Sequence, residues 1–238
     1  MPSGTKITSE IMYSHPTKLG GMSSSPPKTV APSTRAPVIN ERLAREHPDA
    51  QCELDFDSPL QLLVATVLSA QCTDARVNSV TPELFHTYPT AADYAASRRE
   101  DLEAILRPLG FQRAKAGYLM GIGERLVSEF DGEVPQTVQE LTSLPGVGRK
   151  SALVVLGDAF GVPGLTVDTH FSRLMQRLEL TREKTPVKIE RDIAKLIVKP
   201  EWTVFSHRVI FHGRRICHAR NPECRNCVVR DLCPAALG

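Results

Sequence analysis

Hydrophobic residues recur along this chain with the spacing of amphipathic α-helices, three and four positions apart with polar residues between them. This pattern predicts helices over residues 38–47, 60–68, 73–87, 99–107, 112–129, 136–143, 150–160, 169–179, 187–198 and 201–215. Ser58 and Pro59 mark one helix start, as an N-cap followed by proline at the first helical position. Alternating runs of β-branched residues and Asn-Gly turns are missing, so we expect an all-α fold.

The first 37 residues differ in composition from the rest of the chain. They contain six prolines and seven serines but few large apolar residues. A segment of this kind cannot bury enough apolar surface to offset the entropy that it loses on ordering. We therefore expect residues 1–37 to form a disordered tail.

Composition and charge narrow the class of protein only a little. The chain has 238 residues, 41% of them hydrophobic, which suffices for one good-sized domain or two small ones. Its net charge of +2 does not by itself indicate a nucleic-acid partner. Six arginines and one glutamate lie between Phe205 and Arg230, and this basic stretch suits a phosphate backbone, although most charge runs are simply solvated. No apolar stretch approaches the roughly 18–20 residues of a membrane span, and no secretion signal is evident, so we expect a cytosolic protein.

Four cysteines near the C-terminus form the clearest candidate for a metal centre. Cys217, Cys224, Cys227 and Cys233 follow the spacing C-x6-C-x2-C-x5-C. In a cytosolic protein such a cluster indicates a metal or iron–sulfur site before it indicates disulfides. Four thiolates suit either tetrahedral zinc or a cubane [4Fe–4S] cluster, and the spacing alone does not decide between them. Cys52 and Cys72 lie far away and are expected to be small buried apolar residues.

The sequence LPGVGRK at residues 144–150 leads directly into a predicted helix. Gly146 and Gly148 flank one apolar residue, which is typical of a tight hairpin that presents backbone N–H groups to an anion such as phosphate. Lys150 is unusual there, because the helix dipole disfavours a cation in the first turn. A lysine whose positive charge is disfavoured by the helix dipole loses its proton more readily, and the neutral amine that results is a nucleophile. The segment therefore suggests covalent chemistry beside a bound phosphate.

Asp168 stands just before the apolar run that predicts the helix at 169–179. Taken alone, it is best interpreted as the N-cap of that helix. A carboxylate at a helix start can also accept a proton from an amine, or stabilise positive charge that develops on a sugar. Beside Lys150 and the glycine hairpin, the catalytic interpretation becomes the stronger one, and the two roles are compatible.

Two further segments carry residues that suit an opened DNA duplex. Gln71 either ends a helix or enters the duplex to fill the space left by an extruded base. Phe111 is either a core aromatic or a wedge between base steps. Arg113 and Lys115 follow it, and either contact phosphates or face water.

Together these pieces resemble the endonuclease III family of DNA glycosylases. The matching segments are LSAQ at 68–71, LPGVGRK at 144–150 and VDTH at 167–170, followed by the four cysteines. The resemblance covers about residues 38–238. It implies a helix–hairpin–helix fold of two α-helical domains with DNA in the cleft between them.

By the same resemblance, residues 52–162 form a six-helix barrel that includes the hairpin. An N-terminal helix at 38–51 packs with residues 163–238, where a [4Fe–4S] cluster is held by the four cysteines. The resemblance also implies DNA contacts, made by Gln71, Phe111, Arg113, Gly146, Gly148, Arg149, His170 and Arg220.

The activity implied by the resemblance is that of a bifunctional DNA glycosylase and abasic-site lyase of base excision repair. Lys150 attacks C1′ of a flipped-out nucleotide and displaces the damaged base, giving a Schiff base. Asp168 supports deprotonation of the lysine or the cationic sugar, and β-elimination then breaks the strand on the 3′ side. The expected partner is double-stranded DNA with oxidised pyrimidines or abasic sites, and the expected protein is a monomer in the cytoplasm, associated with the nucleoid and not with a membrane.

Two alternatives stay open. The related adenine glycosylases share the fold and the cysteine spacing, but they usually lack a lysine at the position of Lys150. They also carry an extra C-terminal domain, whereas this sequence stops five residues after Cys233. A non-catalytic iron–sulfur module for DNA binding or redox sensing would not need Lys150 and Asp168 together.

Overall fold

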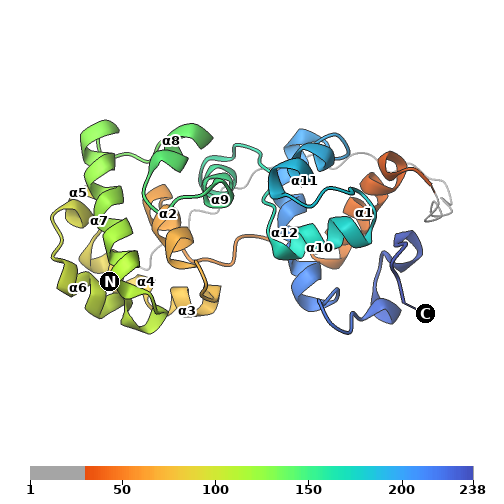
Figure 1. Ribbon diagram of the computed structural model, residues 1–238, viewed down its shortest axis with the longest axis horizontal. Helices are drawn as coiled ribbons and strands as arrows, with labels where there is room; N and C mark the ends of the chain where they lie inside the picture. Colours follow the sequence, from red (N-terminus) through yellow and green to blue (C-terminus); the bar gives the residue numbers. More distant parts are fainter. Residues whose placement is uncertain (1–29, 238) are drawn as a thin grey trace, which may run out of the picture.

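The computed structural model describes residues 30–237, and within them every regular element is a helix (Figure 1). The α-helices are α1 (Pro32–Glu46), α2 (Pro59–Leu68), α3 (Asp74–Asn78), α4 (Thr81–Thr87), α5 (Ala91–Ala95), α6 (Arg99–Leu106), α7 (Gln112–Glu129), α8 (Val138–Ser143), α9 (Arg149–Phe160), α10 (Thr169–Arg177), α11 (Pro186–Ile193) and α12 (Trp202–Arg215). Short 3-10 turns are η1 (Arg107–Leu109), η2 (Lys199–Glu201), η3 (Cys224–Asn226) and η4 (Arg230–Leu232). The expected all-α fold is confirmed. None of these helices is long and apolar enough to cross a bilayer.

The helix boundaries differ from the prediction where short elements follow one another. The predicted helix at 73–87 is in fact α3 and α4, and a proline in the first turn of α4 marks the second start. The helix α5 was not predicted, because its five residues are too few to show a helical period. It is instead defined by a capping box, in which Thr90 and Asp93 satisfy each other's backbone N–H groups.

The predicted tail boundary at residue 37 was wrong, since α1 begins at Pro32; residues 1–29 lie outside the described residues. Arg35 is only 2% exposed. Its guanidinium donates hydrogen bonds to the carbonyls of Leu178 (2.8 Å) and Leu232 (2.7 Å). The composition of this segment was misleading. A proline suits the first turn of a helix, and an arginine can be buried when backbone carbonyls accept its hydrogen bonds.

Replacing Arg35 by methionine should therefore lower the free energy of unfolding by about 2–3 kcal/mol, since it leaves two buried carbonyls without their donors. Urea unfolding of the full chain measures this change. Arg45→Met is the matched control, because Arg45 lies on the same helix and forms only an exposed pair with Glu41. Its loss should cost less than about 0.5 kcal/mol. Equal, small losses in the two variants would contradict a structural role for Arg35.

Two hydrophobic clusters divide the described chain, and they correspond to the two lobes in Figure 1. One cluster gathers buried residues between Leu54 and Leu156. The other joins the apolar face of α1 to residues between Leu165 and Leu232. Two connections cross between the lobes, one leading from α1 to α2 and one from α9 to α10. These cores support the proposal that residues 52–162 form one domain and that α1 packs with residues 163–238 in another.

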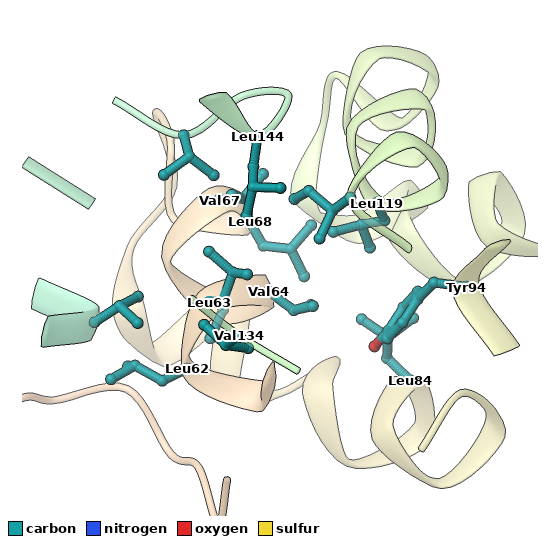
Figure 2. Packing of buried hydrophobic residues seen from close by; sticks show 14 of the residues in the cluster. Leu62, Leu63, Val64, Val67, Leu68, Leu84, Tyr94, Leu119, Val134 and Leu144 are labelled. Atoms are coloured by element: carbon teal, nitrogen blue, oxygen red, sulfur yellow. The ribbon is translucent and has the colours of Figure 1, made fainter. Parts of the chain in front are cut away.

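The helix α2 is the centre of the first core. Its apolar run is continuous rather than one-sided, which is typical of a helix buried on all faces. Figure 2 shows Leu63, Val64 and Leu68 of α2 among side chains from several other helices, including Leu84, Tyr94 and Leu119. This packing fixes the end of α2, and with it the segment that follows at residues 69–73.

Candidate functional site

A pocket of about 70 Å³ is lined by both Lys150 and Asp168. Its walls also include Asp74 at the start of α3, and His207 and Arg214 on α12. The pocket therefore lies between helices of the two cores. The structure brings together the lysine and the aspartate that the sequence analysis paired, although seventeen residues of chain separate them.

The hairpin between α8 and α9 holds Lys150 at the start of a helix. Gly146 has a left-handed backbone (φ 74°), and a Cβ there would come within 2.8 Å of the Tyr118 ring, so only glycine fits. Gly148 is the N-cap of α9, and a Cβ on it would meet nothing within 4 Å. The helix N-terminus is thus open to an approaching anion, and the exposed Lys150 stands one residue inside it.

Asp168 is held in place from two sides. Its Oδ1 accepts a hydrogen bond from the backbone N–H of Phe171 at 2.7 Å, so it is the N-cap of α10. The loop before it is attached to α12, because Gly164 N–H donates to Thr203 Oγ1 (3.3 Å) and Thr166 N–H donates to Ser206 Oγ (2.9 Å). A fixed carboxylate of this kind can act on the pocket and cap a helix at the same time.

Three charged residues of the pocket were missed by the sequence analysis. Arg214 forms ion pairs with Glu53 and with Asp74, the latter at 3.0 Å. Burial raises the pKa of the Asp74 carboxyl, while Lys150 opposes this rise and Asp168 adds to it. These charges therefore interact across the pocket. They come from distant segments without a common motif, so no sequence signal could have grouped them.

At the wall of the pocket, a buried pair that includes His207 joins α9 to α12. His207 Nε2 lies 2.8 Å from Asp158 Oδ1, and the two side chains are only 11% and 12% exposed. The helices meet closely here, since a Cβ on Gly157 would lie 2.8 Å from the Thr203 side chain. Asp158 Oδ2 is buried and has no hydrogen-bond partner among the described residues. The pair thus fixes the helix that carries Lys150 against the helix that anchors the Asp168 loop.

His207→Leu should destabilise the protein by about 3 kcal/mol, because it leaves the buried Asp158 carboxylate without its partner. The double variant Asp158→Leu, His207→Leu should regain stability to within about 1 kcal/mol of the original chain, since two apolar side chains then face each other. Urea unfolding of the three proteins measures both changes. If the double variant is less stable than His207→Leu alone, the carboxylate is satisfied in some other way.

The two residues expected to enter a duplex have the same unusual backbone. Gln71 (φ 55°) and Phe111 (φ 51°) are both left-handed, a conformation that costs free energy in residues other than glycine and that clusters at functional sites. Both are exposed, Phe111 to 66%, so Phe111 is not a core aromatic. Arg113 is exposed beside it. Lys115 is instead buried, so both interpretations of it, as a phosphate contact and as a solvated residue, were wrong.

The other expected DNA contacts have varied surroundings. Arg149 forms two hydrogen bonds with Glu190 of α11, at 2.6 and 2.9 Å, so a phosphate would have to compete with this carboxylate. His170 Nδ1 lies 3.2 Å from the Arg173 guanidinium. Arg220 is exposed on the loop between Cys217 and Cys224.

The four C-terminal cysteines line one cavity of about 30 Å³. Arg177 donates to Cys217 Sγ at 3.1 Å, and a ring nitrogen of His212 lies 3.3 Å from Cys227 Sγ. Burial raises the pKa of the Cys227 thiol to about 11, so binding of a metal centre must displace protons.

The chemistry of this cavity suits a metal centre, because the cavity gathers four thiols. Within residues 30–237, no three His, Cys, Asp or Glu side chains lie close enough together to hold one metal ion. A cubane cluster holds its ligand sulfurs farther apart than one zinc ion does, because each cysteine binds a different iron. Cys52 and Cys72 lie elsewhere and pack, half-buried, against the first core.

Comparisons with known proteins agree with this geometry. Residues 64–199 match the model of the HhH-GPD superfamily of base excision DNA repair proteins. Endonuclease III of Synechocystis sp. is 51% identical over 216 residues, which cover 90% of this chain and 99% of that relative. A solved non-covalent endonuclease III–DNA complex is similar with a TM-score of 0.82 at 43% identity, over 86% of this chain and 96% of that chain. A trapped covalent endonuclease III–DNA intermediate, in an estranged-adenine complex, has the same score, identity and coverage.

The match to the family model spans more than half of the chain, and the Synechocystis relative matches along nearly its whole length. The hairpin, Lys150 and Asp168 lie within the residues that match the family model. The chain belongs to the HhH-GPD superfamily of base excision DNA repair proteins, and within it to the endonuclease III family.

Proposed function

We propose that this chain is a bifunctional DNA glycosylase and abasic-site lyase of base excision repair. Its substrate is double-stranded DNA that contains an oxidised pyrimidine or an abasic site. The observation that carries the proposal is the pocket that Lys150 and Asp168 both line, beside an open helix N-terminus. A similar endonuclease III has been trapped as a covalent intermediate with DNA, which requires a nucleophile of this kind.

The reaction begins when the damaged nucleotide leaves the stack, because C1′ is inaccessible within the duplex. The neutral amine of Lys150 attacks C1′, and the bond to the base breaks with its electron pair leaving on the base. Asp168 accepts a proton from the amine or stabilises the positive sugar. The nitrogen lone pair then opens the sugar ring, O4′ takes up a proton, and a protonated Schiff base forms that can accept the electrons of the next step. Removal of a C2′ proton then expels the 3′ phosphate by β-elimination.

The surrounding residues hold the DNA. Backbone N–H groups at the α9 N-terminus bind a phosphate next to the target sugar, and the glycines of the hairpin let it approach. Gln71 and Phe111 occupy the space that the extruded nucleotide leaves. The DNA backbone is contacted by Arg113, Arg149, His170 and Arg220. Arg149 must first exchange its Glu190 partner for a phosphate.

We further propose that the four cysteines hold a [4Fe–4S] cluster. The cavity shared by four thiols supports a metal centre, and the likeness to endonuclease III supports a cluster over zinc. The bound cluster would cross-link the chain at Cys217 and Cys224, and so shape the basic loop between them. Iron and sulfide analysis of the purified protein, with its visible absorption, tests this; stoichiometric zinc and a colourless protein would refute it.

Borohydride trapping tests the activity. Reduction of the Schiff base should join the protein covalently to a duplex with one abasic site, and a panel of duplexes with single defined lesions should show release of oxidised pyrimidines. Release of adenine without trapping would support a monofunctional adenine glycosylase. Binding without either reaction would support a non-catalytic module. We also propose that the protein is a monomer, which sedimentation with and without DNA tests. Because its substrate is DNA, we propose that it is found in the cytoplasm at the nucleoid.

A further inference from the structure

Lys115 is a buried cation in a place where the proposed chemistry does not need one. Its side chain is 3% exposed, on the first turns of α7, and burial lowers the pKa of its ammonium group. Burying a charge is costly unless the group is well bonded, and an apolar side chain would fill this space at a smaller cost. The charge therefore needs an explanation, and its contacts supply one.

The backbone and the side chain of Lys115 bind opposite ends of one three-residue turn. Its backbone N–H donates to the carbonyl of Phe111 at 3.0 Å, and its ammonium donates to the carbonyl of Leu109 at 3.2 Å. Between them, Gly110 (φ 67°) and Phe111 (φ 51°) are both left-handed. Lys115 thus holds both carbonyls that flank the left-handed glycine, and opposes relaxation of the strained phenylalanine that follows it.

The same ammonium lies near the other segment that is proposed to enter DNA. Cys72, which directly follows the left-handed Gln71, is near enough to influence the pKa of the Lys115 ammonium. The turn η1, which ends at Leu109, packs against α3, which starts just after the Gln71 segment. The two exposed residues with strained backbones therefore project from neighbouring turns with Lys115 at their base.

We propose that Lys115 is a positioning residue that holds the Leu109–Phe111 turn against the Gln71 turn, so that both side chains enter a duplex as one rigid unit. This inference rests on the proposed function, because it assigns Lys115 to the opening of the duplex and not to the bond-breaking steps. A residue that positions a wedge affects only substrates with a base stack to open, whereas a residue needed only for stability affects all substrates alike.

The test compares single-turnover cleavage of an abasic site in duplex and in single-stranded DNA. Lys115→Met keeps the side-chain length but removes the N–H donors. It should slow cleavage of the duplex about tenfold or more and change cleavage of the single strand less than about twofold. A 2-aminopurine next to the abasic site should show a smaller fluorescence rise on binding, because the duplex opens less. Phe111→Ala should give the same duplex-specific loss, and adding Lys115→Met to it should cost little more.

Leu126→Ala is the matched control for lost stability, since Leu126 is fully buried on the same helix but lies far from the turn. It should affect the two substrates equally. Equal slowing of both substrates by Lys115→Met, or full additivity with Phe111→Ala, overturns the positioning role. If Lys115→Met does not fold, Lys115→Gln gives the same comparison, because its shorter side chain does not reach Leu109. Absence of cleavage by the unchanged protein would instead refute the proposed function, while the fluorescence change still tests Lys115.

Discussion

Lys150→Gln is expected to abolish the covalent complex with abasic DNA and to slow strand cleavage by about 10⁴-fold or more. Glutamine cannot form a Schiff base, so the first bond of the proposed reaction is never made. DNA binding should persist, because the phosphate is bound by backbone N–H groups of the hairpin, which the substitution leaves in place. Borohydride trapping and a binding titration on the same abasic duplex measure the two effects separately.

Lys184→Gln is a suitable control for the loss of one positive charge. Lys184 is exposed on the segment between α10 and α11 and does not line the pocket. This variant should trap and cleave like the original chain. Undiminished trapping by Lys150→Gln would show that another amine is the nucleophile, and the mechanism proposed for this pocket would then be wrong.

Asp168→Asn should slow removal of a damaged base by about 10²- to 10³-fold while the melting temperature stays nearly unchanged. Asparagine is as good an N-cap as aspartate, so the bond from Phe171 N–H is kept. What disappears is the negative charge that accepts a proton or stabilises the sugar cation. Single-turnover kinetics on a duplex with one lesion measures the rate of base removal. Thermal unfolding measures the melting temperature, which reports whether the helix cap is kept.

Asp168→Ala separates the two roles further, because it removes both the charge and the cap. We expect the same loss of rate together with a loss of about 1 kcal/mol in the free energy of unfolding. If Asp168→Asn removes bases as fast as the original chain, Asp168 acts only as a helix cap. Lys150 would then need another partner in the pocket, and Asp74 lies close enough to interact with it.

The sequence alone was sufficient to predict the helical fold. It also predicted that Lys150 lies near Asp168 and that the four C-terminal cysteines lie together. Lys150, Asp168 and the four cysteines each belong to a local pattern with a physical meaning, such as a glycine hairpin or a helix cap. The pairs Asp158–His207 and Glu53–Arg214 could not be found in this way, because they form only when α9, α12 and the segment before α2 pack together. Lys115 shows the opposite error, since the sequence offered a phosphate contact or a residue that faces water, whereas the ammonium is buried and donates to the carbonyl of Leu109.

The packing of α1 has a consequence for the order in which the molecule folds. All the buried residues of the core between Leu54 and Leu156 have been synthesised once Leu156 has left the ribosome. The second core needs α1 together with Leu232, which are separated by nearly the whole sequence. The apolar face of α1 therefore stays partly uncovered until Leu232 has left the ribosome. The four cysteines, with any cluster that they hold, also leave the ribosome after the residues of the lobe that carries Lys150.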